Sequence, residues 1–153
     1  MEPNERLALL APDLRQAPPR SPRVKLGDHV IAARTLDKCR ATLHGTNGDY
    51  HFDCPLDNLF FEFTGLTAER FRERVAEGAT DTEMGEWIAA EAHPRERIEI
   101  IHWNNQMRAQ RLIDMPDAIQ EFMEDYIPAN VPAHLQNRIH VFFDIYDAEE
   151  GRF

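Results

Sequence analysis

The sequence predicts an all-α fold, and three observations support this class. Seven stretches have apolar residues at helical spacing, their boundaries carry capping residues, prolines and glycines, and no two segments alternate like paired strands. We expect about seven helices, two of them long and central, in a single compact domain over residues 23–153. Residues 1–22 hold five of the ten prolines and are expected to form an arm over this domain, with at most a short helical turn.

The first long helix is expected within residues 20–50, where the chain enters through a Ser-Pro pair and leaves through Gly45. Apolar residues begin one face of this helix as a core stripe. At about 100° per residue, Asp37, Arg40 and His44 fall on the same face. A face that changes from apolar to charged predicts either a lined cavity or a buried ion pair.

Three short helices are predicted next, each from its boundary residues. Pro55 suits the first turn of a helix, and Gly65 ends it. Thr67 caps a second helix that ends at Gly78. Residues 80–83 form a capping box that opens the third.

The second long helix is expected to run from Pro94 to about Ile113, with apolar residues on two sides. Its second apolar face would need a cover, which the N-terminal arm or a second copy of the chain in a homodimer could supply. His102 and Asn105 interrupt the first face. We interpret them as hydrogen-bonded core residues or as the wall of a site opposite Asp37.

Two helices complete the prediction, one that begins at Pro116 and a last one that Gly151 closes. The large apolar residues around the two long helices are expected to form the core. This predicted core consists of Leu26, Val30, Ile98, Ile101, Leu112, Phe122, Ile139 and Phe142.

The charge balance of the chain makes some classes of binding partner improbable. The chain has 27 acidic and 17 basic residues and a formal net charge of −10. This argues against nucleic acid or an anionic membrane as the main partner, because both require basic patches. No apolar run reaches the length of a membrane span, and the N-terminus does not resemble a signal peptide. We therefore expect a cytoplasmic protein whose two cysteines are reduced thiols.

Asp37 and Arg40 are the first candidates for a site, because residues three apart can pair across one helical turn. One interpretation is a structural ion pair that fixes the helix against its neighbours. The other is a pocket for an anion or carboxylate, with Arg40 as the clamp and Lys38 or His44 near its rim.

Histidine and cysteine side chains supply the second set of candidates. His44, His51 and Cys54 offer donors that zinc accepts, but only the last two have the tight spacing of a ligand pair, so we predict no metal and no cofactor. Cys39 and Cys54 are candidate nucleophiles, which would need a low pKa and a positioned base. Cys54 precedes a predicted helix with His51 nearby, although a cysteine before proline is more often a buried cap.

Four ordered motifs resemble those of a known family: R-S-P at 20–22, D-K-C-R at 37–40, G-T-N-G-D-Y at 45–50 and G-A-T-D-x-E-M-x-x-W at 78–87. The family comprises small, mostly bacterial proteins known only as a domain of unknown function, and the resemblance covers residues 18–90. It implies no activity, cofactor or catalytic residue. In that family the cysteine of D-K-C-R is replaceable by alanine, which argues against a catalytic Cys39.

The leading functional interpretation is a helical domain that binds a small ligand or a partner protein, without nucleic acid or membrane. The alternative is a small cytoplasmic enzyme that uses the end of the first long helix for acid–base or thiol chemistry. A water-accessible cleft with convergent polar groups would favour a site, and sealed charges would favour a structural role. The candidate ligand-binding residues are Asp37, Lys38, Arg40, His44, Tyr50, His51, Cys54, His102 and Asn105.

Overall fold

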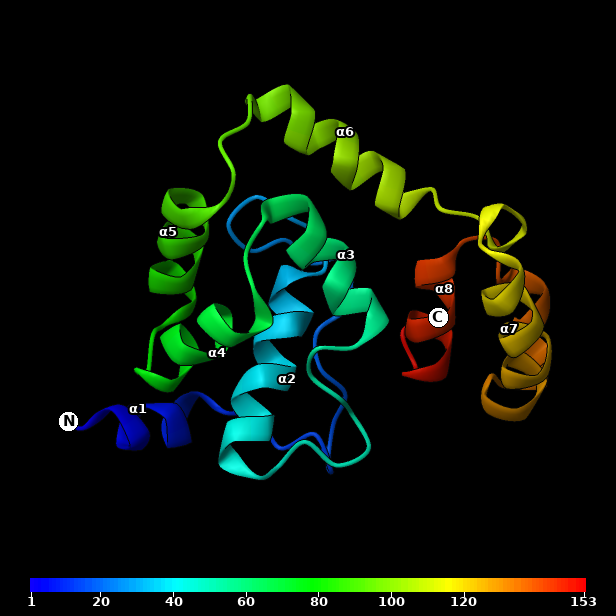
Figure 1. The fold of residues 1–153 in the computed structure, drawn as a ribbon. Coiled ribbons are helices and arrows are strands. Elements are labelled where there is room, and N and C mark those ends of the chain that lie inside the picture. Colours follow the sequence, from blue (N-terminus) through cyan, green and yellow to red (C-terminus); the bar gives the residue numbers. More distant parts are fainter. The chain divides into compact units, whose positions relative to one another are not determined.

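A computed structural model describes the fold of residues 1–153. It has no strands apart from two isolated bridges, so the predicted all-α class is confirmed. None of the helices combines the length and the apolar composition needed to cross a lipid bilayer. Figure 1 shows α1 (Pro3–Leu10), α2 (Ala32–His44), α3 (Pro55–Thr64), α4 (Ala68–Ala76), α5 (Asp81–Glu91), α6 (Arg97–Arg108), α7 (Asp117–Asn130) and α8 (Phe142–Glu149), with two short 3-10 helices, η1 (Leu112–Asp114) and η2 (Ala133–Arg138).

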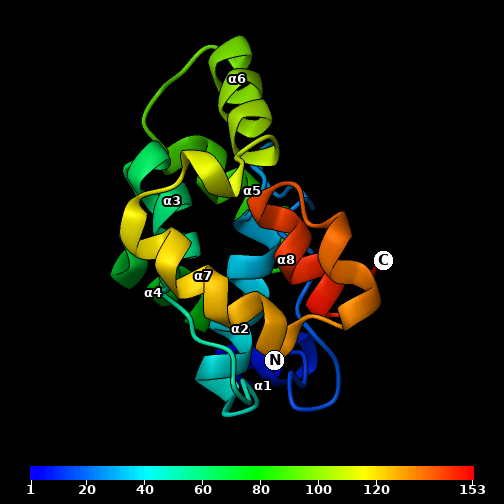
Figure 2. The same cartoon turned by 90° about the vertical axis from the view of Figure 1, so that its right-hand side faces the viewer.

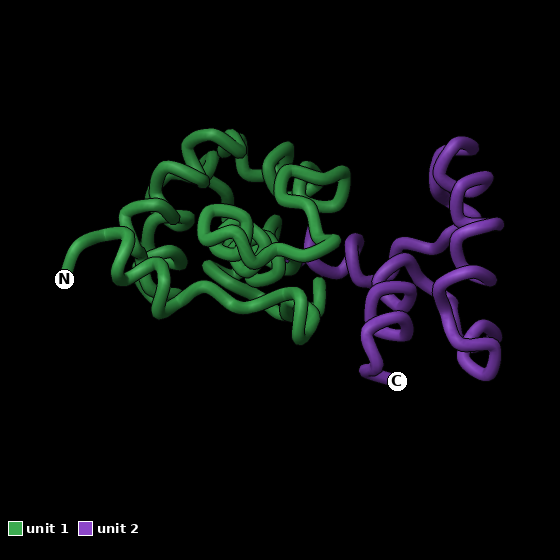
Figure 3. The backbone as a smooth tube through the Cα atoms, turned by 90° about the horizontal axis from the view of Figure 1, so that it is seen from below, with its two compact units in different colours: residues 1–100 green, residues 101–153 purple.

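The chain divides into two compact units. The first comprises Met1–Ile100 and the second Ile101–Phe153, so the boundary falls within α6 (Figure 3). A helix, α1, forms inside the segment that was expected to be an arm without a lasting helix. The division of the chain into an arm over residues 1–22 and one domain over 23–153 stays a prediction.

α2 is the central helix of the first unit. Each residue from Ala32 to Ala41 is buried, and α1, α3 and α4 pack against the helix (Figure 1). A surface helix normally keeps one polar face in water. α2 has no such face over its first ten residues, so the charged side chains along it must find partners inside the protein.

Aromatic rings fill the space beside α2. Phe71 of α4 contacts Phe61 edge-on at a centroid distance of 5.5 Å, and Phe60 and Trp87 at 6.1 Å. The side chains of Phe60 and Phe71 are fully buried. Edge-to-face packing of this kind adds to the free energy gained by burying the rings.

The predicted first long helix is wrong at its start, because α2 begins only at Ala32. Gly27 and Asp28 have φ values of 54° and 70° and form a two-residue turn. Across this turn, Leu26 and His29 exchange backbone hydrogen bonds of 3.0 and 3.1 Å. Two consecutive residues with positive φ are typical of the tight turn of a hairpin and stop helix formation.

The predicted core is correct at Val30 and Phe142 but wrong at Ile98 and Phe122, which are 53% and 60% exposed. The other four residues of that set are partly exposed. In α6, the second apolar face is the buried one, since Trp103 and Met107 are both buried. A face that carries a tryptophan and a methionine offers more apolar area to bury than the aliphatic face opposite.

This orientation of α6 also corrects the interpretation of His102 and Asn105 as core residues. Both are exposed, and Asn105 accepts a 3.0 Å hydrogen bond from Arg108 one turn later. They lie in the second unit and carry no buried polar contact. Helical spacing alone did not distinguish the buried face, because both faces of α6 are apolar.

The second unit is built around α8. Phe142, Phe143, Ile145 and Ala148 of this helix are buried, whereas α7 has no buried residue. The Tyr126 hydroxyl of α7 donates a 2.7 Å hydrogen bond to the Glu149 carboxylate of α8. Figure 2 shows α7 in yellow and α8 in red within this unit. This hydrogen bond therefore links α7 to α8, while much of the surface of α7 is exposed to water.

We predict that Phe71→Ala lowers the free energy of unfolding by about 3–5 kcal/mol, because the change removes a fully buried ring from an aromatic cluster. Leu9→Ala in α1, where the side chain is 74% exposed, serves as the control and should change stability by less than about 0.5 kcal/mol. Chemical denaturation measures both. Equal effects of the two substitutions would contradict this description of the core.

A second prediction concerns His29, which is buried and lies edge-on to Phe60 and Phe63. Burial lowers the pKa of His29 below its ordinary 6.5, although its hydrogen bond to the Gly27 carbonyl opposes this shift. The unfolded chain therefore binds the proton more readily, and stability should fall as the pH drops below 6.5. Thermal melts of the wild type and of His29→Gln should show that the variant loses this part of the pH dependence.

Candidate functional site

The charged residues of the D-K-C-R segment lie on a buried stretch of α2. Asp37, Lys38 and Arg40 are each less than a tenth exposed. They point toward different neighbours, because successive helical residues are about 100° apart. Two separate polar clusters result, one around Asp37 and Arg40 and the other around Lys38.

The first cluster starts with Asp37 and Arg20. The Arg20 guanidinium binds the Asp37 carboxylate through Nη2 to Oδ1 at 2.9 Å and through Nε to Oδ2 at 3.0 Å. The backbone N–H of Arg20 donates a further 2.9 Å bond to Oδ2 of Asp37. Such a two-pronged arrangement is the strongest way for arginine to hold a carboxylate.

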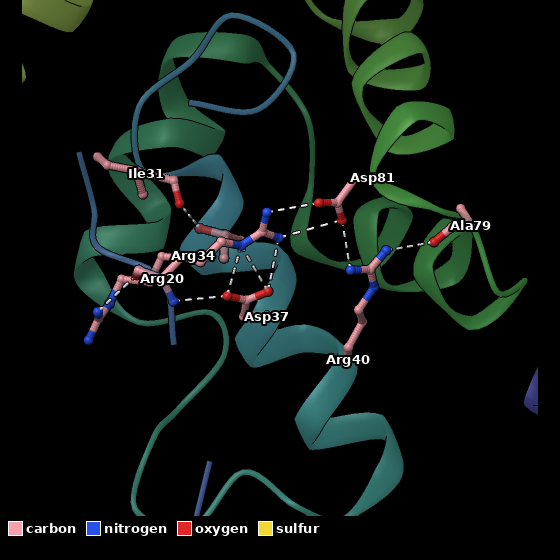
Figure 4. A network of polar contacts seen from close by, with 8 residues as sticks. Arg20, Ile31, Arg34, Asp37, Arg40, Ala79 and Asp81 are labelled. Carbon is pink, nitrogen blue, oxygen red and sulfur yellow. Dashed lines mark hydrogen bonds and ion pairs between the residues drawn. The ribbon is translucent and has the colours of Figure 1, made fainter. Parts of the chain in front are cut away.

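Asp81, the first residue of α5, extends this cluster to Arg40. Its Oδ2 accepts a 2.8 Å bond from Nη1 of Arg20, and its Oδ1 accepts one of 2.8 Å from Nη1 of Arg40. Nη2 of Arg40 donates to the carbonyl oxygen of Ala79 at 2.8 Å. Figure 4 shows the resulting order, Asp37, Arg20, Asp81, Arg40. We call these four residues the ionic network. Asp37 and Arg40 do not pair directly, contrary to the expected pairing across one turn.

Electrostatics favour the charged form of the ionic network. Burial alone would raise the pKa of Asp81, but the hydrogen bonds and positive charges of Arg20 and Arg40 outweigh it and hold the pKa below the ordinary 3.8. The Asp81 side chain is 47% exposed, so the network reaches the surface at α5. The network joins the chain at Arg20, helix α2 and the start of α5, which are distant in sequence. This is a structural role.

The second cluster surrounds Asp57 of α3, which is completely buried. Nζ of Lys38 forms an ion pair of 2.9 Å with Asp57 Oδ1, and the Thr35 hydroxyl donates a 2.7 Å bond to the same oxygen. The backbone N–H groups of Asp53 and Cys54 donate to Oδ2 at 3.0 and 3.4 Å. Nζ of Lys38 also donates to Sγ of Cys54 at 3.1 Å. We call this set the Lys38 cluster.

The remaining candidates do not join these clusters. His44 and His51 are exposed, and Tyr50 is half-buried with its ring 5.6 Å from the Arg34 guanidinium carbon. No group of three or more His, Cys, Asp or Glu side chains lies close enough together to hold a metal ion. His102 and Asn105 lie in the second unit, where both are exposed.

Sequence reasoning missed several residues of both clusters, namely Arg20, Thr35, Asp57, Ala79 and Asp81. Three of these, Arg20, Ala79 and Asp81, belong to the R-S-P and G-A-T-D motifs that carry the family resemblance. The two motifs contained a usable signal, because each carries a charged residue that could form an ion pair with the charges of D-K-C-R. Asp57 gave a local signal as an acidic residue in the first turn of a helix.

Of the two cysteines, only Cys54 is placed where its thiol could react. Cys39 is fully buried, and burial raises its pKa to about 12, which keeps it a neutral thiol. Cys54 is partly exposed and touches an ammonium group. The other charged groups of the two clusters already have opposite charges as partners, so none of them is free to bind an added ligand.

We predict that breaking the ion pair of the Lys38 cluster costs more than removing it. Lys38→Met leaves Asp57 charged and buried, and Asp57→Asn does the same to Lys38, so each should lower the free energy of unfolding by about 3–5 kcal/mol. The double variant should lose clearly less than the sum of the two. Urea denaturation of all four proteins tests this. Small and strictly additive losses would mean that the pair is not sealed from water.

Comparison with known proteins places the chain in a family. No curated protein matches it. A family model described as "Domain of unknown function (DUF5069)" matches residues 16–152, which extends beyond the residues 18–90 on which the resemblance was based. Residues of three motifs of that resemblance meet in the ionic network. Because the match spans most of the 153 residues, the chain belongs to the DUF5069 family, a domain of unknown function.

Proposed function

We propose that this protein is a cytoplasmic binding module that recognises a partner protein through α7. The observation that carries this proposal is the exposure of α7, a 14-residue helix in which no residue is buried. A helix of this length without a fully buried residue contributes little to stability by itself. Its surface is therefore available for another molecule.

The surface of α7 combines an aromatic residue with acidic ones. Phe122 is 60% exposed and stacks on Tyr126 with a centroid distance of 5.5 Å. At about 100° per residue, the exposed acidic residues fall on one face next to Phe122. They are Asp117, Glu121, Glu124 and Asp125. Ile113, which is 67% exposed, precedes the helix.

This surface suits a basic partner segment that also carries apolar side chains. Acidic side chains attract a basic surface and orient it, whereas the stacked rings offer the large apolar contact typical of interface hot spots. The ring faces can also accept an arginine or lysine through cation–π contact. An acidic partner is disfavoured by the net charge of −10.

The other functions considered have less support. A small-molecule site at the end of α2 would need convergent polar groups open to solvent, but Asp37, Lys38 and Arg40 are buried and paired within the clusters. An enzyme based on the same residues would need a free acid or base among them, and their charges are already matched. Partner binding requires neither.

The experiment places a photoreactive phenylalanine analogue at position 122 of the full chain in cells, and at position 73 as the control. Glu73 is an exposed residue of α4 in the first unit. We expect a discrete protein adduct at position 122 only. The purified partner should bind Phe122→Ser about tenfold or more weakly than the wild type, because a central aromatic anchor is lost.

Charge reversal supplies the second criterion. Glu121→Lys should weaken binding and reduce its salt dependence, whereas Glu73→Lys should not. Circular dichroism should show that all variants keep the melting temperature of the wild type within a few degrees. Identical adducts at both positions, or unchanged binding by Phe122→Ser, would rule out α7 as the recognition surface.

A further inference from the structure

A cysteine sulfur and a buried lysine amine are in contact in the first unit. Sγ of Cys54 lies 3.1 Å from Nζ of Lys38, which donates a hydrogen bond to it. The Lys38 side chain is only 4% exposed and is held by the ion pair with Asp57. The amine is therefore held directly beside the sulfur of a residue that is itself partly exposed.

Two features of this pair favour chemistry at the sulfur. The thiolate is the form of cysteine that attacks peroxides, and an ammonium neighbour complements the negative charge that sulfur carries in that step. Lys38 is a nucleophile once it has lost a proton, and Asp57 Oδ1, 2.9 Å away, can accept that proton. Both groups are positioned before any reaction starts, which lowers the entropic cost of joining them.

We propose that Cys54 is a peroxide-oxidation site whose oxidised sulfur forms a covalent bond with Nζ of Lys38. In the first step, the Cys54 sulfur attacks hydrogen peroxide, its O–O bond breaks, and a sulfenic acid and one water are formed. In the second step, Nζ of Lys38 attacks this sulfur, an S–N bond forms and a second water leaves. Overall, a thiol, an ammonium group and one peroxide give the sulfenamide, two waters and one proton, which Asp57 takes up from Lys38.

The reaction changes the Lys38 cluster in two ways. The S–N bond joins α2 to the residue that precedes α3, closing a covalent loop between positions 38 and 54. At the same time the positive charge of Lys38 is lost, so the buried carboxylate of Asp57 no longer faces a cation. Oxidation thus replaces an ion pair by a covalent bond, and thiols can reverse it because they attack S–N bonds.

Cys39 provides a control within the same chain. It is the residue next to Lys38 in the sequence, but it is fully buried and its pKa is raised to about 12 by burial, so it should not react with peroxide. A Cys39–Cys54 disulfide would also link the peptide that contains Cys54 to this segment, through residues 39–40 when trypsin cuts after Lys38. Cys39→Ala removes this ambiguity and leaves the Lys38 cluster unchanged.

The experiment treats folded Cys39→Ala with hydrogen peroxide, blocks free thiols and digests the protein with trypsin. Cleavage at the arginines yields residues 35–40, which contain Lys38, and residues 41–70, which contain Cys54. We expect these two peptides to be joined, uncut after Lys38, with a mass equal to their sum less two hydrogen atoms. Treatment with a thiol reductant should separate them again.

Three further samples make the result decisive. Cys54→Ser and Lys38→Arg should give no joined peptide. Because Lys38→Arg could disturb a buried site, Cys39→Ala oxidised in urea serves as a second test. It should form oxidised Cys54 without the joined peptide, since the two groups are no longer held together.

The proposal would be overturned by stable sulfinic acid at Cys54 without any joined peptide. A joined peptide that persists in Lys38→Arg, or that forms equally well in urea, would also overturn it. A link that forms in the wild type but disappears in Cys39→Ala would identify a disulfide instead.

Discussion

The burial of the first ten residues of α2 on all sides is the constraint on which the first unit depends. Asp37, Lys38 and Arg40 lie on a helix without a solvated face, so each needs an opposite charge supplied by another segment. Arg20, Asp57 and Asp81 supply these charges. The positions of the chain before α2 and of the first turns of α3 and α5 follow from this requirement as much as from apolar packing.

The two clusters meet this requirement differently. The ionic network includes the half-exposed carboxylate of Asp81, where solvent screens part of the interaction. The pair of Lys38 and Asp57 is sealed, and backbone N–H groups together with a threonine hydroxyl complete the hydrogen bonding of Asp57. A sealed pair is sensitive to the loss of either partner, whereas an open network tolerates rearrangement. A covalent change at Lys38 should therefore alter the stability of the protein more than one at Asp81.

Local signals predicted much of the fold. The boundaries expected for α3 agree with the structure, and Thr67 and Thr80 cap α4 and α5 through hydrogen bonds to backbone N–H groups, as predicted. The start of α2 was not recognised, because the Gly27-Asp28 turn was read as part of a helix. The charged residues expected on one face of this helix are buried in α2, but Arg20 and Asp81, the partners of Asp37 and Arg40, lie far away in sequence. Helical periodicity contains no information on such long-range pairs.

The ionic network also bears on how the first unit folds. Arg20 and Asp81 are separated by 61 residues, and their contact closes a loop that contains α2, α3 and α4. The entropy of closing this loop must be overcome before the ion pairs form, and contacts between distant residues slow folding. α2 is short and gains its stability from neighbours on every side. We therefore expect the first unit to assemble in one cooperative step, with α2 as its last segment to exchange amide hydrogens with solvent.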